Sequence, residues 1–251
     1  MISIKSEEEI KIMKEGGEIL SKMAKGLSKK VKVGISTGEL NRAADALFSR
    51  YKVEPAFLNH QGFPAAICTS VNQTVVHGVP SAYLLKDGDV LSVDLGLKHK
   101  GYYLDMAFSA LVGDKKSASP AASQLVKTAE TALGLAVEAA RPGATPGDLG
   151  FIVQSYVEKQ GFNVVRNLCG HGIGKELHED PQIPNYGLPG EGEALREGMV
   201  ICLEPMIAMG GWKLRKSADG FGYETVDGSL AAHFEQTIAI TKKGPLVLTK
   251  L

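Results

Sequence analysis

The strongest constraint on this fold is an internal repeat. LKDGDVLSVDL (85–95) and LREGMVICLEP (195–205) share one pattern: a Leu, a base, an acid, a Gly, one variable residue, a Val, and then mostly apolar residues that end in a carboxylate. In register, Gly88 matches Gly198 and Asp94 matches Glu204, and 110 positions separate the members of each pair. Because duplicated segments fold alike, each copy is expected to carry one acid to the end of a buried strand.

Further matches occur in the same order along the chain. They are GISTGEL (34–40) with GATPGDL (143–149) at a spacing of 109, HGVP (77–80) with HEDP (178–181) at 101, and Asp105 with Glu235 at 130. The changing spacing requires only insertions in surface loops, which folds tolerate well. We therefore predict two homologous halves, about 1–115 and 116–251, related by a pseudo-twofold axis.

Composition favours one domain. A length of 251 residues allows one or two domains, but 44% hydrophobic residues and 29 glycines suit a single globule, 1–251, with many tight turns. Lys plus Arg equals Asp plus Glu at 28 each, so no net field draws the chain to nucleic acid or to an anionic membrane. The charged N-terminus lacks the apolar run of a signal peptide or a membrane span, and we expect a cytoplasmic protein.

The three cysteines, Cys68, Cys169 and Cys202, are odd in number and show no CxxC spacing. This pattern predicts reduced thiols, without a disulfide scaffold or a zinc knuckle.

Periodicity and capping signals predict an α+β fold with antiparallel sheet covered by helix pairs. Capping boxes are expected at Ser6–Glu9, Ser36–Glu39 and Thr145–Asp148. The predicted helices are 7–30, 37–52, 118–140 and 146–160, and the predicted strands are 66–76, 90–98, 102–112, 162–168, 199–208 and 233–241.

Three familiar motifs fail on context. GISTG (34–38) resembles a nucleophile elbow but follows a helix tail where the elbow needs a strand, so Ser36 is expected to be a helix cap. CGHGIGK (169–175) lacks the first Gly and the final Ser or Thr of a Walker loop. His178-Glu179 matches the start of the zinc-binding HExxH motif, which lies on a helix. Gln182 stands where this motif has its second histidine, and Pro181 would disrupt the helix.

A set of four acids and one imidazole remains, and it comprises Asp94, Asp105, His171, Glu204 and Glu235. Each alone is more often a solvated strand end or a satisfied core histidine. Four acids on apolar strands that converge about one axis would repel each other and take up protons unless cations compensate them. Two divalent ions balance four carboxylates and leave a neutral imidazole as the nitrogen ligand, a set that suits Mn, Fe, Co or Zn. A purely structural ion site is the alternative, but His77 and His178 favour a hydrolytic centre.

At these residues the chain resembles the type I methionine aminopeptidases of the pita-bread fold. The motifs that carry the resemblance are SVNQTVVHGVP, the spacing of eleven between Asp94 and Asp105, GHGIGKELHEDP, LEPM and FEQT, and they extend from the first helix to the last strand. The short spacings after His171 resemble the compact bacterial form, without an N-terminal zinc-binding extension.

The resemblance implies roles for these residues. Asp105 and Glu235 would bridge two divalent metal ions, Asp94 would chelate one, and His171 with Glu204 would complete the other. Glu204 would move the proton of the attacking water, His178 would stabilise the oxyanion, and His77 would hydrogen-bond the substrate. The catalytic residues would thus be His77, His178 and Glu204.

The implied substrate pocket departs from the family pattern at several positions. Its lining would be Phe57, His60, Phe63, Cys68, His77, Leu177, His178 and Phe221. Relatives often carry Cys where Phe57 stands, Tyr at His60, His at Gln61, Phe at Leu177 and Trp near Phe221. Apolar residues suited to a thioether side chain remain in this lining, so methionine is the expected first residue. A change in the size of the pocket by one or two methylene groups alters its selectivity by only about 1 to 3 kcal/mol.

The first function predicted is removal of the initiator methionine from nascent chains or peptides, by a monomer with a transient ribosome contact, no direct nucleic-acid function and no membrane association. An aminopeptidase of the same fold with a different first-residue or X-Pro preference is one alternative, although the proline-specific relatives carry a large extra N-terminal domain. A metal-free binding module is the other, and near-stoichiometric metal binding would exclude it.

Overall fold

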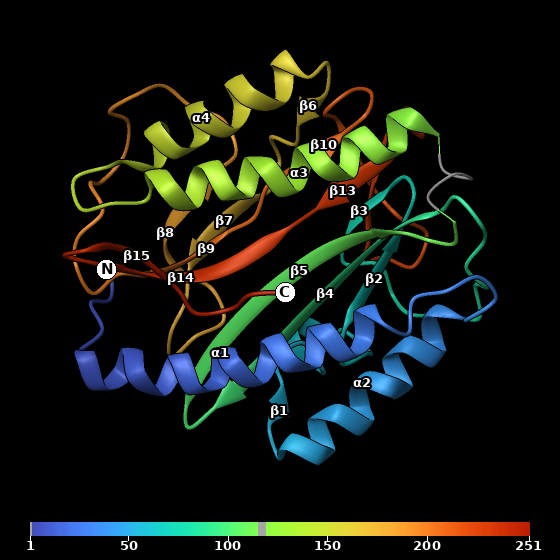
Figure 1. The fold of residues 1–251 in the computed structure, drawn as a ribbon, viewed down its shortest axis with the longest axis horizontal. Coiled ribbons are helices and arrows are strands. Elements are labelled where there is room, and N and C mark those ends of the chain that lie inside the picture. Colours follow the sequence, from blue (N-terminus) through green and yellow to red (C-terminus); the bar gives the residue numbers. More distant parts are fainter. Residues whose placement is uncertain (1, 115–118) are drawn as a thin grey trace.

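The computed structural model describes residues 2–114 and 119–251, and within them helices cover an antiparallel sheet. α1 packs on β4 and β5, whereas α3 contacts β9, β13 and β14 in the other half (Figure 1). The helices are α1 (Glu7–Ser28), α2 (Thr37–Tyr51), α3 (Pro120–Ala139) and α4 (Pro146–Lys159), with a 3₁₀ turn, η1 (His60–Gly62). None of the described helices combines the length and apolarity needed to cross a membrane.

The main sheet repeats one arrangement of three strands in each half of the chain. Its order is β1-β4-β5-β14-β9-β7-β8, with β2 also on β4 and β15 also on β14, and all neighbours run antiparallel. The strands are β1 (Glu54–Pro55), β2 (Cys68–Val71), β4 (Val90–His99), β5 (Tyr102–Leu111), β7 (Cys169–Gly172), β8 (Glu179–Pro184), β9 (Val200–Leu203), β14 (Glu235–Thr241) and β15 (Gly244–Val247). The strands β2, β4 and β5 of the first half thus mirror β7, β9 and β14 of the second.

Two three-stranded sheets flank this one. One has the order β13-β10-β6 and the other β11-β12-β3. Their strands are β3 (Thr74–Val76), β6 (Asn163–Val164), β10 (Met206–Ala208), β11 (Leu214–Lys216), β12 (Tyr223–Thr225) and β13 (Ala231–His233).

The strand registers of the two halves superimpose. Val93 pairs with Phe108 in the first half, as Leu203 pairs with Gln236 in the second, and these equivalents differ by 110 and 128 positions. The same two offsets carry the pair Gly96–Asp105 onto the pair Met206–His233. This agreement supports the internal duplication that we infer, whose expected boundary at 115 and 116 lies outside the described residues.

The register also corrects one predicted correspondence. Asp105 is equivalent to His233 and not to Glu235, because the offset between these strands is 128 and not 130. Glu235 is instead the equivalent of Ala107, and the two are also direct partners across the contact of β14 with β5. The pseudo-twofold axis therefore passes beside Glu235.

The helix predictions agree with the structure, and three capping boxes form as expected, at Ser6–Glu9, Ser36–Glu39 and Thr145–Asp148. Ser36 is thus a helix cap and not a nucleophile. The predicted start of the third helix, at 118, lies outside the described residues.

Several predicted strands are wrong in extent. The stretch 66–76 is two strands, because Asn72 adopts a left-handed backbone conformation between them, and of 162–168 only β6 forms. The stretch 199–208 breaks after Leu203, since Pro205 has no N–H to donate to a ladder, and 233–241 breaks at Phe234. β7 and β8 were not predicted as strands.

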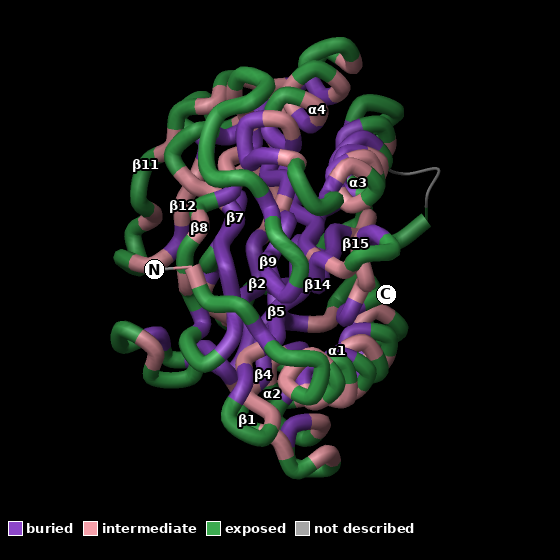
Figure 2. Tube along the Cα trace, turned by 90° about the vertical axis from the view of Figure 1, so that its left-hand side faces the viewer, coloured by how far each residue is buried: buried purple, intermediate pink, exposed green. Residues whose placement is uncertain are grey.

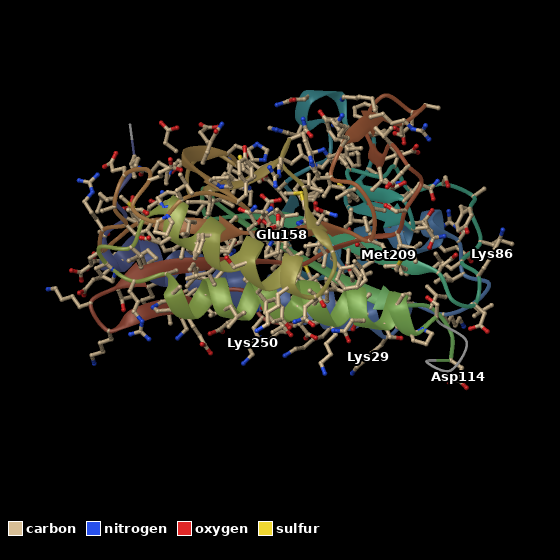
Figure 3. All side chains as sticks on the ribbon, turned by 90° about the horizontal axis from the view of Figure 1, so that it is seen from above. Lys29, Lys86, Asp114, Glu158, Met209 and Lys250 are labelled. Carbon is tan, nitrogen blue, oxygen red and sulfur yellow. The ribbon has the colours of Figure 1, made fainter. Side chains whose placement is uncertain are left out.

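The core lies between the helices and the sheet. Figure 2 shows the buried strands β4, β5, β9 and β14 beside helices whose outer surfaces are exposed. Seen from above, the helices form one side of the molecule, and Lys29 and Lys250 lie on that side (Figure 3). The other side of the sheet is therefore left for the functional site.

Replacing Gly17 tests how closely the C-terminal segment packs on α1. A Cβ at Gly17 would overlap the carbonyl oxygen of Leu248, a backbone atom that cannot rotate away. We expect Gly17→Ala to lower the free energy of unfolding by about 2 kcal/mol in urea. Gly26→Ala on the same helix is the control, because its Cβ would lie 3.6 Å from Leu47 Cδ1 and should stabilise by about 0.5 to 1 kcal/mol. Equal effects would contradict this packing.

Candidate metal centre and substrate pocket

Five neighbouring strands bring the predicted ligands together. In sheet order, β4 carries Asp94, β5 carries Asp105, β14 begins at Glu235, β9 leads into Glu204, and β7 carries His171. Asp94, Asp105, His171 and Glu235 are buried, and Glu204 is nearly so, with 12% of its side chain exposed. Residues spread over 142 positions, from 94 to 235, thus meet across one sheet.

Their donor atoms are close enough to share cations. Three groups have ligand atoms within 4.8 Å of one another: Asp94 with Asp105 and Glu235, Glu204 with His233 and Glu235, and His171 with Cys202 and Glu235. Glu235 belongs to all three groups, as its position beside the axis leads one to expect.

The carboxylates are electrostatically strained without a cation. Burial raises the pKa values of Asp105, Glu204 and Glu235 well above their ordinary range, and neighbouring carboxylates raise them further. Burial also raises the pKa of Asp94, to about 6. Asp94 Oδ1 and Glu235 Oε1 are buried without a hydrogen-bond partner among the described residues. Buried, unpartnered carboxylate oxygens gathered at one point are the donors that divalent ions require, so these residues fit a metal centre.

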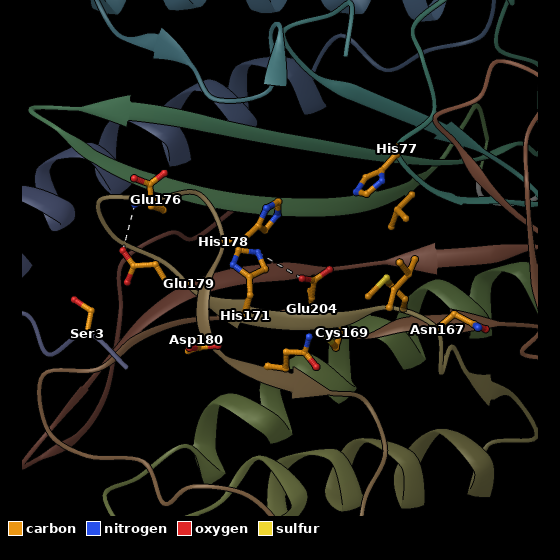
Figure 4. Close-up of a pocket in the computed structure, with 14 residues that line it drawn as sticks. Ser3, His77, Asn167, Cys169, His171, Glu176, His178, Glu179, Asp180 and Glu204 are labelled. Atoms are coloured by element: carbon orange, nitrogen blue, oxygen red, sulfur yellow. Dashed lines mark hydrogen bonds and ion pairs between the residues drawn. The ribbon is translucent and has the colours of Figure 1, made fainter. Parts of the chain in front are cut away.

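Local structure orients His171 as a ligand. Its Nδ1 lies 2.8 Å from the carbonyl oxygen of Gly172, so an Nδ1–H donor leaves Nε2 free, 3.7 Å from Glu204 Oε1 (Figure 4). Burial lowers the pKa of His171 to about 4, which keeps the ring neutral and able to coordinate.

The glycines beside His171 are required by packing. Side chains at Gly170 and Gly172 would overlap the carbonyl oxygens of Cys202 and Asp180 on the two adjacent strands. The Gly-rich run 169–175 is therefore a tightly packed strand that leads into a loop, which agrees with the rejection of a phosphate-binding loop.

All thirteen predicted site residues line one pocket of about 320 Å³. Beside the five candidate ligands these are Phe57, His60, Phe63, Cys68, His77, Leu177, His178 and Phe221. Phe63 and Phe221 meet edge to face with ring centroids 5.5 Å apart, and Cys68 pairs in register with Asp94. The pocket thus places an apolar wall next to the carboxylate cluster.

A wider cavity of about 770 Å³ shares His77, His171, His178 and Glu204 with this pocket. In Figure 4, His178 stands over His171, and their ring centroids are 4.5 Å apart. Burial lowers the pKa of His178, and lowers that of His77 to about 4, so both rings are neutral donors or acceptors. The small pocket therefore adjoins the wider cavity at these residues.

Sequence reasoning missed other residues of the site. Lys216, Tyr223 and Leu168 line the pocket from segments that no motif marked. His233 and Cys202 lie within ligand distance of the cluster. His233 becomes recognisable once the strand register gives the offset of 128, which places it where Asp105 stands in the first half.

The chain matches the family model described as metallopeptidase family M24 over residues 11–242. It belongs to this family. It is 42% identical to a methionine aminopeptidase of Clostridium perfringens over 99% of both chains. The crystal structure of methionine aminopeptidase from Thermotoga maritima superimposes with a TM-score of 0.97 at 41% identity and covers all of both chains.

A prolidase from Pyrococcus furiosus is a more distant structural relative, with a TM-score of 0.80 and 26% identity over 99% of this chain but only 65% of the prolidase. These likenesses confirm the predicted α+β pita-bread architecture and the use of divalent metal by this M24 chain.

The raised carboxyl pKa values predict how the metal-free protein responds to pH. The native state keeps these groups protonated while the unfolded chain ionises. Their contribution to stability is therefore fully present below about 4, the ordinary carboxyl range, and is lost as the pH rises through about 6, the pKa of Asp94, and beyond. We expect Asp105→Asn to reduce this decline, as measured by urea unfolding with chelator between pH 5 and 8.

The difference between the unaltered protein and Asp105→Asn measures the effect of the carboxylate cluster, because both proteins contain all the other acids of the chain. Asp45→Asn is the control, because that carboxylate is exposed on α2. An unchanged pH profile in Asp105→Asn would contradict the electrostatic description of the site.

Proposed function

We propose that this chain removes the N-terminal methionine from nascent proteins and peptides by metal-dependent hydrolysis. The observation that carries the proposal is one pocket lined both by the five candidate metal ligands and by an aromatic and sulfur-containing wall. Full-length similarity to proteins named methionine aminopeptidases supports it.

We further propose two divalent ions per chain, drawn from Mn, Fe, Co or Zn. Asp105 and Glu235 would hold both ions, Asp94 would hold one, and His171 with Glu204 would hold the other. The presence of Glu235 in every ligand cluster supports its bridging role. When bound, such a pair of ions polarises the peptide carbonyl and lowers the pKa of a water molecule toward neutrality.

The protein's own groups then handle protons and charge. Glu204 accepts a proton from the attacking water and delivers it to the amine that leaves as the peptide C–N bond breaks. His178, beside His171, donates a hydrogen bond to the carbonyl oxygen as negative charge develops on it. His77, which lines both cavities, binds the peptide next to the scissile bond.

The small pocket would take the methionine side chain. Its thioether would lie near Cys68 and against the rings of Phe63 and Phe221, where sulfur makes favourable contacts with aromatic edges. Phe57, His60 and Leu177 complete the lining, and because they depart from the family pattern they determine how strictly this pocket selects methionine.

Two alternatives are weaker. The prolidase is only 26% identical to this chain, whereas the methionine aminopeptidases of Clostridium perfringens and Thermotoga maritima are 42% and 41% identical, which favours methionine over an X-Pro substrate. A metal-free binding module would not be expected to retain every candidate ligand in one pocket. The expectations of a monomer, a cytoplasmic location and a transient ribosome contact stay predictions.

Peptide cleavage tests the proposal directly. After loading with Mn, Co or Fe, the protein should release free methionine from Met-Ala-Ser and leave Ala-Pro intact. Asp105→Ala and Glu235→Ala should abolish both metal binding and release. Absence of release with every divalent metal would reject the aminopeptidase, and preferential cleavage of Ala-Pro would establish the alternative substrate.

The role of His178 can be tested separately from metal binding. We expect His178→Ala to lower kcat about 100-fold or more, the usual effect of losing one oxyanion donor, with little change in bound metal. His99→Ala is a matched control, because that imidazole lies at the far end of β4, beside Glu15. Loss of metal from His178→Ala would instead make this residue part of the ion site.

A further inference from the structure

His233 is a second imidazole that faces the carboxylate cluster. It ends β13, its exposure is 1%, and its Nε2 lies 3.4 Å from Glu204 Oε2 and 3.9 Å from Glu235 Oε2. Neither ring nitrogen has a hydrogen-bond partner among the described residues. A buried imidazole without partners is destabilising by itself, so its position calls for a ligand.

The duplication gives an independent reason. The register places His233 where Asp105 stands in the first half, opposite Met206 as Asp105 is opposite Gly96. Asp105 points a donor atom into the cluster from its strand, and the equivalent backbone position in the second half aims the His233 ring at the same cluster. Both halves thus contribute a side chain from this position.

The backbone of His233 is fixed without help from its side chain. Ser109 Oγ donates to the carbonyl oxygen of His233 at 2.9 Å and accepts its N–H at 2.9 Å. These two bonds position the main chain of His233, so its ring is not needed to fix the backbone and both ring nitrogens stay available.

The distances fit a shared ion. Two ligand atoms that each lie about 2.0 to 2.2 Å from one cation are about 3 to 3.5 Å apart, and the separation of His233 Nε2 from Glu204 Oε2 is 3.4 Å. Glu204 stands between two imidazoles, with Oε1 toward His171 and Oε2 toward His233.

We propose that His233 Nε2 coordinates an ion together with Glu204 and Glu235, since the donor atoms of these three residues lie within 4.8 Å of one another. Because the proposed function also gives His171 to the ion of Glu204, that ion would have two imidazole ligands. The inference rests on the proposed metal function and deepens it. Imidazole donors suit Fe, Co and Zn better than Mn, which carboxylates and water satisfy, so His233 biases this position toward the former ions.

Cobalt binding measures this directly. With one equivalent of Co(II), proton NMR should show two exchangeable, hyperfine-shifted imidazole N–H signals in the unaltered protein and one in His233→Gln. Calorimetry should show Co(II) affinity about 100-fold lower in the variant, because losing a ligand costs at least as much as losing its supporting contacts, and the loss for Mn(II) should be smaller.

His99→Gln is the matched control and should keep both signals and full affinity. His233→Asn provides a second, smaller side chain, and urea unfolding of the metal-free variants verifies that each is folded. Two remaining signals with unchanged affinity in both His233 variants would overturn the inference while leaving methionine release intact. Failure of the unaltered protein to bind Co(II) at all would overturn the proposed function as well.

Discussion

Mutual repulsion of four buried carboxylates is the constraint on which the rest of this structure depends. Asp94, Asp105, Glu204 and Glu235 lie on or beside largely apolar strands, and the sheet leaves their oxygens little water. Such an arrangement is unfavourable unless the groups bind protons or cations. Divalent cations would remove this repulsion, and a cation bound by Asp105 and Glu235 would link residues of both halves.

Part of this site could be predicted from the sequence. Equivalent positions of the two halves often require the same type of residue, and these matches are visible as a repeat. Gly88 and Gly198 and the acids Asp94 and Glu204 sit in the same places in both copies, and the capping residues at Ser36 and Thr145 open equivalent helices. These local signals fixed the order of elements. The pocket residues, in contrast, followed from resemblance to a family, since nothing local distinguishes Phe57 or Leu177 from other buried apolar residues.

The breaks in the strands could not be predicted in the same way. Pro205 and Phe234 interrupt opposite members of one ladder, yet pairing resumes beyond both with unchanged register, as Met206 opposite His233. Alignment of one acid with another in the sequence therefore gives Glu235 as the counterpart of Asp105, whereas the register gives His233, two positions earlier. Residues two positions apart on a strand lie on the same face of a sheet, so Glu235 also points toward the site. The alignment with Glu235 was therefore chemically reasonable, and His233 was not recognised.

The same register explains how a symmetric fold can make an asymmetric centre. Asp94 is equivalent to Glu204, Asp105 to His233, and Ser70 to His171, since the last two stand opposite Ser92 and Cys202. Glu235 alone occupies the axis, where one carboxylate reaches both sides and its counterpart is the small Ala107. At these equivalent positions the first half therefore offers oxygen donors and the second adds imidazoles. If two ions bind as proposed, their positions would differ in chemistry although the backbone makes them alike, and an oxygen-rich position and a nitrogen-containing one would bind the same metal with different strength.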